Sequence, residues 1–447
     1  MQKKGLRPCL FFLKKNDLFA REIDNFELSK ITVMYRLIYF SIFVFLLSAC
    51  KSDKKTELPI SEEPIEVVQS IDNPSQNNSE LPRLFSNGKE LFFSWIERRD
   101  SIDVLYYAKY NKDKWWDETE VIHGDDWFTN WADFPAIAES NGNILTSFLQ
   151  KSAPDTYTYD VKLNLYQAES QTSINNFILH NDGTKSEHGF VSMLPSGEDQ
   201  FFVTWLDGRL TAGGHGDHDA HGSGGAMTLR AAYVASDGEI FNEEELDNRI
   251  CDCCQTSAAM TPNGPVVVYR DRSENEVRDI SIVRRMGGSG WSEPMTVYED
   301  NWEIDGCPVN GPSIDAIGNN LAVAWFTVTE GMPKVQVAFS EEGGFGMPVR
   351  IDAHDAIGRV DIVMLSESEA AVSWMENIGD EAAVQLMKVN SDGTKSEPIT
   401  IAKTSPERAS GFPQIELLHG KIYVAWTSVG VDDLKTIEMA SVKIENL

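Results

Sequence analysis

The chain has 447 residues, of which 42% are apolar, and a formal charge of −30 that comes from 69 acidic and 39 basic residues. This length and composition allow a large hydrophobic core and need no second domain. The negative charge argues against nucleic acid as a ligand and against anionic lipid as a docking surface of the domain, because both would be repelled. It is compatible with cations, neutral glycans or simple solubility.

The N-terminal region has the pattern of an export signal that begins at Met34. Residues 1–33 show no feature of such a signal, and we interpret them as a start-site overcall. Residues 34–49 contain a basic Arg36 and an apolar run that is too short to span a membrane in the mature protein, and they end in Leu-Ser-Ala before Cys50. This pattern resembles a bacterial lipoprotein signal peptide, which implies that Cys50 is lipidated. We expect a cell-envelope protein, at the outer membrane or facing the periplasm, that contacts the membrane through this anchor alone.

The next segment, residues 50–80, has the composition of a tether. It is rich in Ser, Asn, Glu and Pro, which disfavour a packed core. A short apolar stretch at residues 64–68 is a candidate closing strand for the domain that follows, which we place at residues 81–447.

Seven copies of a short apolar strand, each built around one aromatic residue, recur through this domain. The aromatics are Trp95, Phe148, Trp205, Tyr269, Trp325, Trp374 and Trp426. Each strand is preceded by a segment with hairpin-forming Asn, Gly, Ser or Pro and followed by a third alternating strand. Such a period of fifty-odd residues predicts an all-β β-propeller, with seven blades favoured over six and the aromatics in the core.

Most of the polar residues that could bind a ligand or take part in catalysis fall in loops that a propeller brings to one rim. Asp207 and Asp271, each just after a second strand, are candidates for general acid and base work on a glycosidic bond. Five arginines could bind an anionic ligand by forked hydrogen bonds: Arg209, Arg270, Arg272, Arg278 and Arg359. Alternatively, these charges form a salt-bridge collar that joins neighbouring blades.

Four cysteines lie in two adjacent inter-blade loops. They are Cys251, Cys253, Cys254 and Cys307. In an oxidising envelope two disulfides are expected, with at least one reaching Cys307 from the other loop. The alternative is a thiolate site for zinc or copper(I), because four converging sulfurs can form a tetrahedral cage.

A Gly-rich segment of blade three carries three histidines with neighbouring aspartates. His215, His218 and His221 are candidate ligands of a divalent metal. The alternative is a solvated, His-rich insertion without preorganisation.

The turns SDGEIF, NSDGTKSEP and GGSGWSEP resemble degenerate Asp boxes of the sialidase superfamily over residues 80–447. The strings CDCCQTS and DGCPVNGP are similar to those of sialidase-like exported bacterial proteins. The resemblance implies three arginines for a substrate carboxylate, a Tyr nucleophile paired with Glu, and an Asp acid. That family places the Tyr late in the chain, whereas this sequence has no Tyr between Tyr298 and Tyr423.

Two classes of function follow. The first is a lipid-anchored, sialidase-like propeller that binds or hydrolyses a glycan, or binds a small anionic ligand, at its axial pocket. The second is a non-catalytic envelope lipoprotein that handles metal or redox chemistry through the Cys and His loops. Metal content and the oxidation state of the cysteines discriminate between the two.

Overall fold

The computed structural model describes residues 67–447 except 77, 212–224 and 354. In these residues it contains 29 β-strands and three short 3-10 turns, at Gly287–Ser289, Val431–Asp433 and Ile444–Asn446. No helix in this part of the chain is long and apolar enough to cross a membrane. The described chain is therefore all-β.

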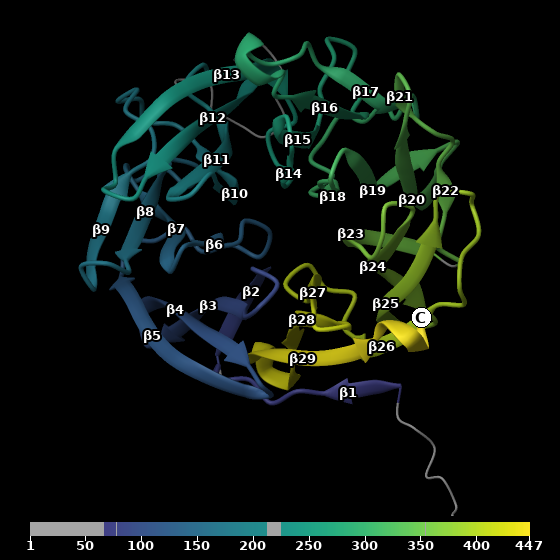
Figure 1. Cartoon of the computed structure of the whole chain (residues 1–447), viewed down its shortest axis with the longest axis horizontal. Coiled ribbons are helices and arrows are strands. Elements are labelled where there is room, and N and C mark those ends of the chain that lie inside the picture. The colour runs from purple at the N-terminus through teal and green to yellow at the C-terminus, as the bar shows by residue number, and fades with distance from the viewer. Residues whose placement is uncertain (1–66, 77, 212–224, 354) are drawn as a thin grey trace, which may run out of the picture. The chain divides into compact units, whose positions relative to one another are not determined.

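The strands form seven antiparallel sheets arranged as blades around an axis, which confirms the predicted seven-bladed propeller (Figure 1). Blade one is β2 (Ser79–Ser86), β3 (Leu91–Arg99), β4 (Ile102–Asn111) and β5 (Lys114–Gly124). Blade two is β6 (Ile137–Ser140), β7 (Asn143–Lys151), β8 (Tyr159–Gln167) and β9 (Thr172–Ile178). Blade three is β10 (His188–Ser196), β11 (Gln200–Asp207), β12 (Met227–Ala235) and β13 (Ile240–Ile250). Blade four is β14 (Ser257–Thr261), β15 (Gly264–Arg270), β16 (Ile280–Arg284) and β17 (Met295–Tyr298).

The remaining three blades follow the same order from the axis outward. Blade five is β18 (Ser313–Ile317), β19 (Asn320–Thr329) and β20 (Met332–Glu341), with β21 (Gly344–Phe345) and β22 (Val349–Arg350) both paired to β20. Blade six is β23 (Asp355–Met364), β24 (Glu369–Ile378), β25 (Glu381–Asn390) and β26 (Ile399–Thr404). Blade seven is β27 (Gly411–Leu418), β28 (Lys421–Val429), β29 (Lys435–Lys443) and β1 (Val68–Ser70). Figure 1 shows the first strand of each blade innermost and the last outermost.

The ring is closed by a strand from the start of the described chain. β1 pairs antiparallel with β29, with Val68 opposite Val442 and Ser70 opposite Ala440. The closing strand therefore begins at the last residue of the stretch expected for it, 64–68, and extends two residues further; residues 64–66 lie outside the described residues. The outer edge of blade seven is thus paired rather than left open.

The seven repeated aromatics lie on the second strands and are core residues. Trp95, Trp205, Trp325 and Trp374 are each 0% exposed, and the other three are at most 3% exposed. Neighbouring blades cover these strands on both faces, which is why their sequences are continuously apolar rather than alternating.

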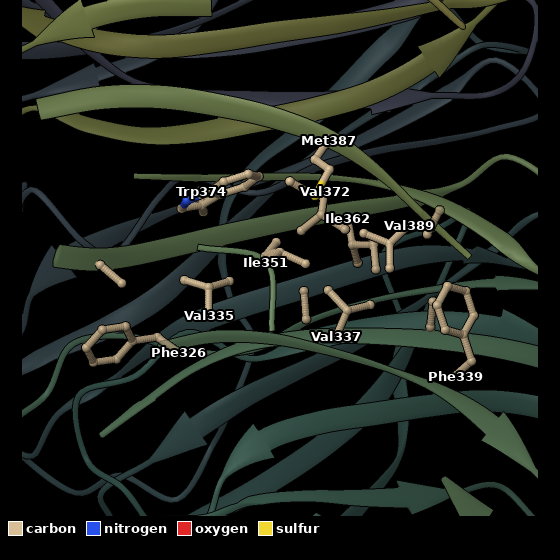
Figure 2. Packing of buried hydrophobic residues seen from close by; sticks show 14 of the residues in the cluster. Phe326, Val335, Val337, Phe339, Ile351, Ile362, Val372, Trp374, Met387 and Val389 are labelled. Atoms are coloured by element: carbon tan, nitrogen blue, oxygen red, sulfur yellow. The ribbon is translucent and has the colours of Figure 1, made fainter. Parts of the chain in front are cut away.

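The core is divided into clusters that join adjacent blades. The largest contains Val335 and Val337 of β20 in blade five together with Val372 and Trp374 of β24 in blade six. Figure 2 shows these side chains facing one another between the two sheets. Packing of this kind fixes how far apart the blade edges stand, and so it positions the loops at the rim.

Candidate functional site

The candidate site lies on the edge of the propeller where first strands begin, second strands end and third strands begin. In blade three these positions are His188, Asp207 and Thr228, which are register neighbours across β10, β11 and β12. We call this edge the polar rim. Asp207, Arg270 and Cys251 all lie on the polar rim, as the propeller geometry predicts. Cys251 directly follows β13.

At the rim, blades two and three are joined by a hydrogen bond between a tyrosine and a glutamate. Tyr159, the first residue of β8, donates from its hydroxyl to Glu187 Oε1 at 2.5 Å. Tyr159 is buried and its ring stacks on Phe128 at 4.1 Å between centroids, whereas Glu187 is partly exposed. The hydroxyl is thus held at the rim by a packed ring and a loop carboxylate.

This pair and a neighbouring aspartate have perturbed proton affinities. Burial raises the pKa of Glu187 to about 7, and the negative charges of Asp252 and Cys307 add to the effect. Burial also raises the pKa of Asp133 to about 8, although its carboxylate accepts a hydrogen bond from the Phe190 amide at 2.8 Å. The pKa of Tyr159 is raised well above its ordinary value by burial and by these two carboxylates. Groups that titrate near neutrality in a partly exposed site are candidates for acid and base catalysis.

Beside this pair lies a network of histidines and aspartates in blades two and three. The rings of His180 and His188 are stacked at 3.6 Å between centroids, and both contact Asp182, at 2.9 Å and 3.2 Å. Burial opposes protonation of both rings. Burial lowers the pKa of His180. At His188 the hydrogen bond to Asp182 and the charge of Asp207 outweigh the effect of burial, so the pKa of His188 is raised. Of the two rings in this network, His188 is therefore the one that the neighbouring carboxylates favour in the protonated form.

Asp207, one of the two predicted catalytic carboxylates, is an anchor of this network. It is 0% exposed, accepts from the Trp205 indole at 2.9 Å, and receives two hydrogen bonds of 2.7 Å from Arg209. Burial alone would raise its pKa, but Arg209 and His188 outweigh it and lower the pKa. A carboxylate that is so fully occupied stays ionised and is poorly suited to donate a proton.

The second predicted carboxylate, Asp271, stands at the same edge of blade four. It accepts from the Arg272 amide at 2.6 Å and from the Ser281 hydroxyl at 3.0 Å. Burial, with the charge of Asp247, raises its pKa. The pKa of Asp271 is therefore shifted in the opposite direction to that of Asp207.

Two of the predicted arginines are buried and hold the backbone together. Arg270 is 2% exposed and donates to the carbonyl oxygens of Asn310, Arg278 and Phe326. Arg359 is 7% exposed and donates to the carbonyl oxygens of Glu407 and Ser410. Both arginines therefore bond backbone carbonyl oxygens of neighbouring segments, and these contacts are not the salt bridges of the collar that was the alternative interpretation.

The other three arginines form ion pairs at the rim. Arg209 bonds Glu243 at 2.9 Å in addition to Asp207. Arg272 joins Asp252 at 2.8 Å to Glu276 at 3.0 Å, and Arg278 bonds Glu276 at 2.5 Å. Arg209 and Arg272 keep 19% and 11% of their side chains exposed, against 2% for Arg278. They are the arginines that a ligand at the rim could reach.

The four predicted cysteines come together, as free thiols, on the rim of blades four and five. The Cys251 sulfur lies 3.5 Å from that of Cys254 and 3.9 Å from that of Cys253, and the three sulfurs form a group with a metal-binding donor set. Cys307, from the next inter-blade loop, interacts with Cys253. None of these cysteines is in a disulfide; the expected disulfide pairing is not seen.

Two predicted elements, the histidine segment and the lipidated cysteine, fall outside the part of the chain that the structure describes. His215, His218 and His221 belong to residues 212–224, and Cys50 precedes residue 67. No sequence pattern marks Tyr159, Glu187, His180 or Asp182. The only available signal was their position, because several of them lie just before a first or third strand, where the rim loops end.

No protein-family model and no curated protein matches the sequence. Among solved structures, a PL25 ulvan lyase bound to -[GlcA(1-4)Rha3S]- superposes with a TM-score of 0.54 and 10% identity, over 84% of this chain and 96% of that chain. The polysaccharide lyase Uly1 gives a TM-score of 0.50 and 10% identity, over 88% and 96%. The phage phi92 endosialidase gives 0.48 and 9%, over 84% and 69%. At 10% identity the likeness to the two lyases establishes the propeller fold alone.

Proposed function

We propose that this protein is a carbohydrate-active propeller that binds and cleaves a glycan at the polar rim, with Tyr159 and Glu187 as its acid and base pair. The observation that carries the proposal is the 2.5 Å hydrogen bond between the Tyr159 hydroxyl and a partly exposed Glu187 whose pKa is raised to about 7. The pair has the two residue types that sialidase-like chemistry requires, at an early position in the chain instead of a late one.

The chemistry needs one group that gives a proton to the leaving oxygen and a second that attacks or removes a proton. Glu187 exists in both protonation forms near neutral pH, because its pKa is close to the operating pH. Because the pKa of Tyr159 is raised well above its ordinary value, the phenol stays protonated at rest, and an ionised Glu187 would accept its proton along the existing hydrogen bond only as the phenolic oxygen forms a new bond. Asp133 is held neutral nearby by a pKa of about 8, so it adds little negative charge at neutral pH.

The fold and the accessible arginines support a glycan as the ligand. Two polysaccharide lyases superpose with TM-scores of 0.54 and 0.50, and one was solved with a uronate-containing ligand. Arg209 and Arg272 are partly exposed at the rim, but Arg209 is paired with Asp207 and Glu243, and Arg272 with Asp252 and Glu276. A sugar carboxylate that binds either guanidinium group by forked hydrogen bonds would have to compete with these carboxylates.

The test is cleavage of a panel of neutral and uronate-containing polysaccharides by the purified full chain, scored for new reducing ends and for unsaturated products. Reducing ends alone indicate hydrolysis, whereas unsaturated products indicate elimination. We expect Tyr159→Phe and Glu187→Gln to lose turnover at least about a hundredfold, the usual range for a positioned acid or base. Tyr166→Phe, at the far end of the same strand β8, is the control and should retain activity.

Two results would contradict the proposal. One is wild-type protein that neither binds nor cleaves any glycan of the panel. The other is turnover that survives in both the Tyr159 and Glu187 variants, in which case Asp271→Asn becomes the next variant to examine. Thermal melting of each variant separates lost chemistry from lost folding.

We further propose that the domain is anchored to a cell-envelope membrane by lipid on Cys50. The support is the Leu-Ser-Ala-Cys sequence behind a basic residue and a short apolar run. Cys50→Ala should move the protein from the membrane fraction to the soluble fraction, with Ser52→Ala as the control. Unchanged membrane retention of the Cys50 variant would refute the anchor.

A further inference from the structure

The three cysteines of the loop after β13 have the mutual spacing of ligands around one metal ion. In a tetrahedral site with metal–sulfur bonds of about 2.3 Å, neighbouring sulfurs are about 3.8 Å apart. The two measured separations, 3.5 Å and 3.9 Å from the Cys251 sulfur, lie on either side of this value. All three sulfurs are within 4.8 Å of one another.

The fourth ligand position is supplied by a loop that is docked firmly on the first. Gly311, in the loop before β18, packs so closely on the main chain of Gln255 that an added Cβ would lie 2.1 Å from its carbonyl oxygen. The Gly311 amide also donates to the Gln255 side chain at 2.9 Å. This docking brings Cys307, four residues earlier, to the Cys253 sulfur. Cys307 is exposed, so the cluster can be reached by an ion from solvent.

Positively charged side chains beside the cluster would stabilise its cysteines as thiolates. Arg278, 2% exposed, donates to the Cys251 sulfur at 3.1 Å. Arg270, also 2% exposed, is a second buried cation beside the cluster, and its four hydrogen bonds all go to backbone carbonyl oxygens. Buried charges are normally paired, because removal from water is costly. Arg278 already bonds Glu276 at 2.5 Å, so a thiolate would be its second anionic partner. For Arg270, whose four hydrogen bonds go to carbonyl oxygens, nearby thiolates would supply the negative charge that neutral disulfides would not.

We propose that Cys251, Cys253, Cys254 and Cys307 together bind one closed-shell, thiophilic metal ion, zinc(II) or copper(I). Each ligating thiol releases its proton to solvent on binding. The four thiolates and a zinc(II) ion carry a net charge of −2, which the neighbouring guanidinium groups of Arg270 and Arg278 stabilise, although Arg278 is shared with Glu276. The ion ties the loop after β13 to the loop before β18, and so fixes the rim between blades three, four and five. The proposal does not depend on glycan cleavage.

The experiment measures bound metal in the full chain, purified without chelator and under reducing conditions, by elemental analysis for zinc and copper. We expect one ion per chain, and its identity separates the two metals. Cys254→Ser and Cys307→Ser should each lower that stoichiometry toward zero. Glu303→Gln removes an exposed carboxylate from the loop that also contains Cys307, and this control should keep the ion.

A second measurement keeps the proposal falsifiable if a serine variant fails to fold. The wild-type protein loaded with cobalt(II) after chelation should show the thiolate charge-transfer absorption and the intense visible bands of a tetrahedral site. Peptide mapping of unreduced protein that finds two disulfides, with no metal uptake after reduction, would overturn the proposal. So would a bound ion that stays in full in both serine variants, since it would then lie elsewhere, for example at the histidines of residues 215–221.

Discussion

Val68 of β1 lies directly opposite Val442 of β29, so the last blade is completed by residues from the two ends of the described chain. The pairing is extended by a hydrogen bond of 2.9 Å from the Ile71 amide to the Met439 carbonyl. Beyond it, the Trp115 indole of blade one donates to the Asp72 carbonyl at 2.6 Å. The closing segment therefore joins blade seven to blade one.

The first prediction concerns this closure. Ile71→Pro should be less stable than Ile71→Ala by about 1 kcal/mol, the net value of a typical hydrogen bond, because both lose the side chain but only proline lacks the amide donor. Urea unfolding of the two variants measures the difference. Equal midpoints would show that the closing strand does not contribute to the stability of the ring.

A second prediction compares two tryptophans of the repeat. The Trp325 indole donates to Asp300 at 2.7 Å, whereas the Trp374 indole nitrogen has no hydrogen-bond partner among the described residues. Both side chains are 0% exposed. Trp325→Phe should cost about 1–3 kcal/mol more than Trp374→Phe, because it leaves the half-buried Asp300 carboxylate with one donor fewer. Chemical denaturation of both variants checks this, and a larger cost at Trp374 would contradict it.

A third prediction concerns pH. The pKa of Asp133 is raised to about 8 in the folded protein, above its value near 3.9 in an unfolded chain. The folded state therefore holds the proton of Asp133 between these values, and the contribution of Asp133 to stability falls as pH rises from 4 to 8. Asp133→Asn removes this dependence while its amide oxygen can still accept from Phe190.

The stability gained by Asp133→Asn over wild type should thus grow with pH, by at most about 1.4 kcal/mol per pH unit, and level off above pH 8. Thermal or urea unfolding at several pH values measures it. Asp155→Asn, which changes an exposed carboxylate, is the control. Parallel stability curves for wild type and Asp133→Asn would show that Asp133 is ionised in the folded protein.

A fourth prediction tests the docking of the two rim loops. Gly311→Ala should lose about 1–3 kcal/mol, because its Cβ would meet the main chain of Gln255 and neither loop can move without disturbing its neighbours. Gly306→Ala lies in the same loop with nothing within 4 Å of the added Cβ and should be close to neutral. Equal melting temperatures for both variants would show that the loops are not docked in solution.

Much of the fold could be predicted from the sequence, because blade formation depends on local patterns. The spacing of Trp95, Phe148 and the later aromatics predicts seven units, and turn residues mark the hairpins. At the turn from β6 to β7, Asn141 and Gly142 have φ of +49° and +86°, the conformation for which Asn-Gly is favoured. The grouping of Cys251, Cys253, Cys254 and Cys307 also followed from sequence, since consecutive inter-blade loops share one rim.

The acid and base site could not be predicted in the same way. Tyr159 and Glu187 are 28 residues apart and belong to different blades, so neither has a local motif that marks it. Their contact, and the raised pKa of Glu187, depend on how far blades two and three are separated and on what buries the carboxyl group. For Asp207 the sequence predicted the position on the rim. It did not predict that Arg209, Trp205 and His188 would contact the carboxylate.

The sequence by itself therefore determined the repeat, the core and the edge on which polar residues gather, because each of these depends on residues within one blade or on chain order. Tertiary structure decided which of those residues are buried, which are paired and which keep a titratable proton. Burial and pairing depend on contacts between blades, and the hydrophobic packing that sets those contacts has no signature in any single segment of the chain.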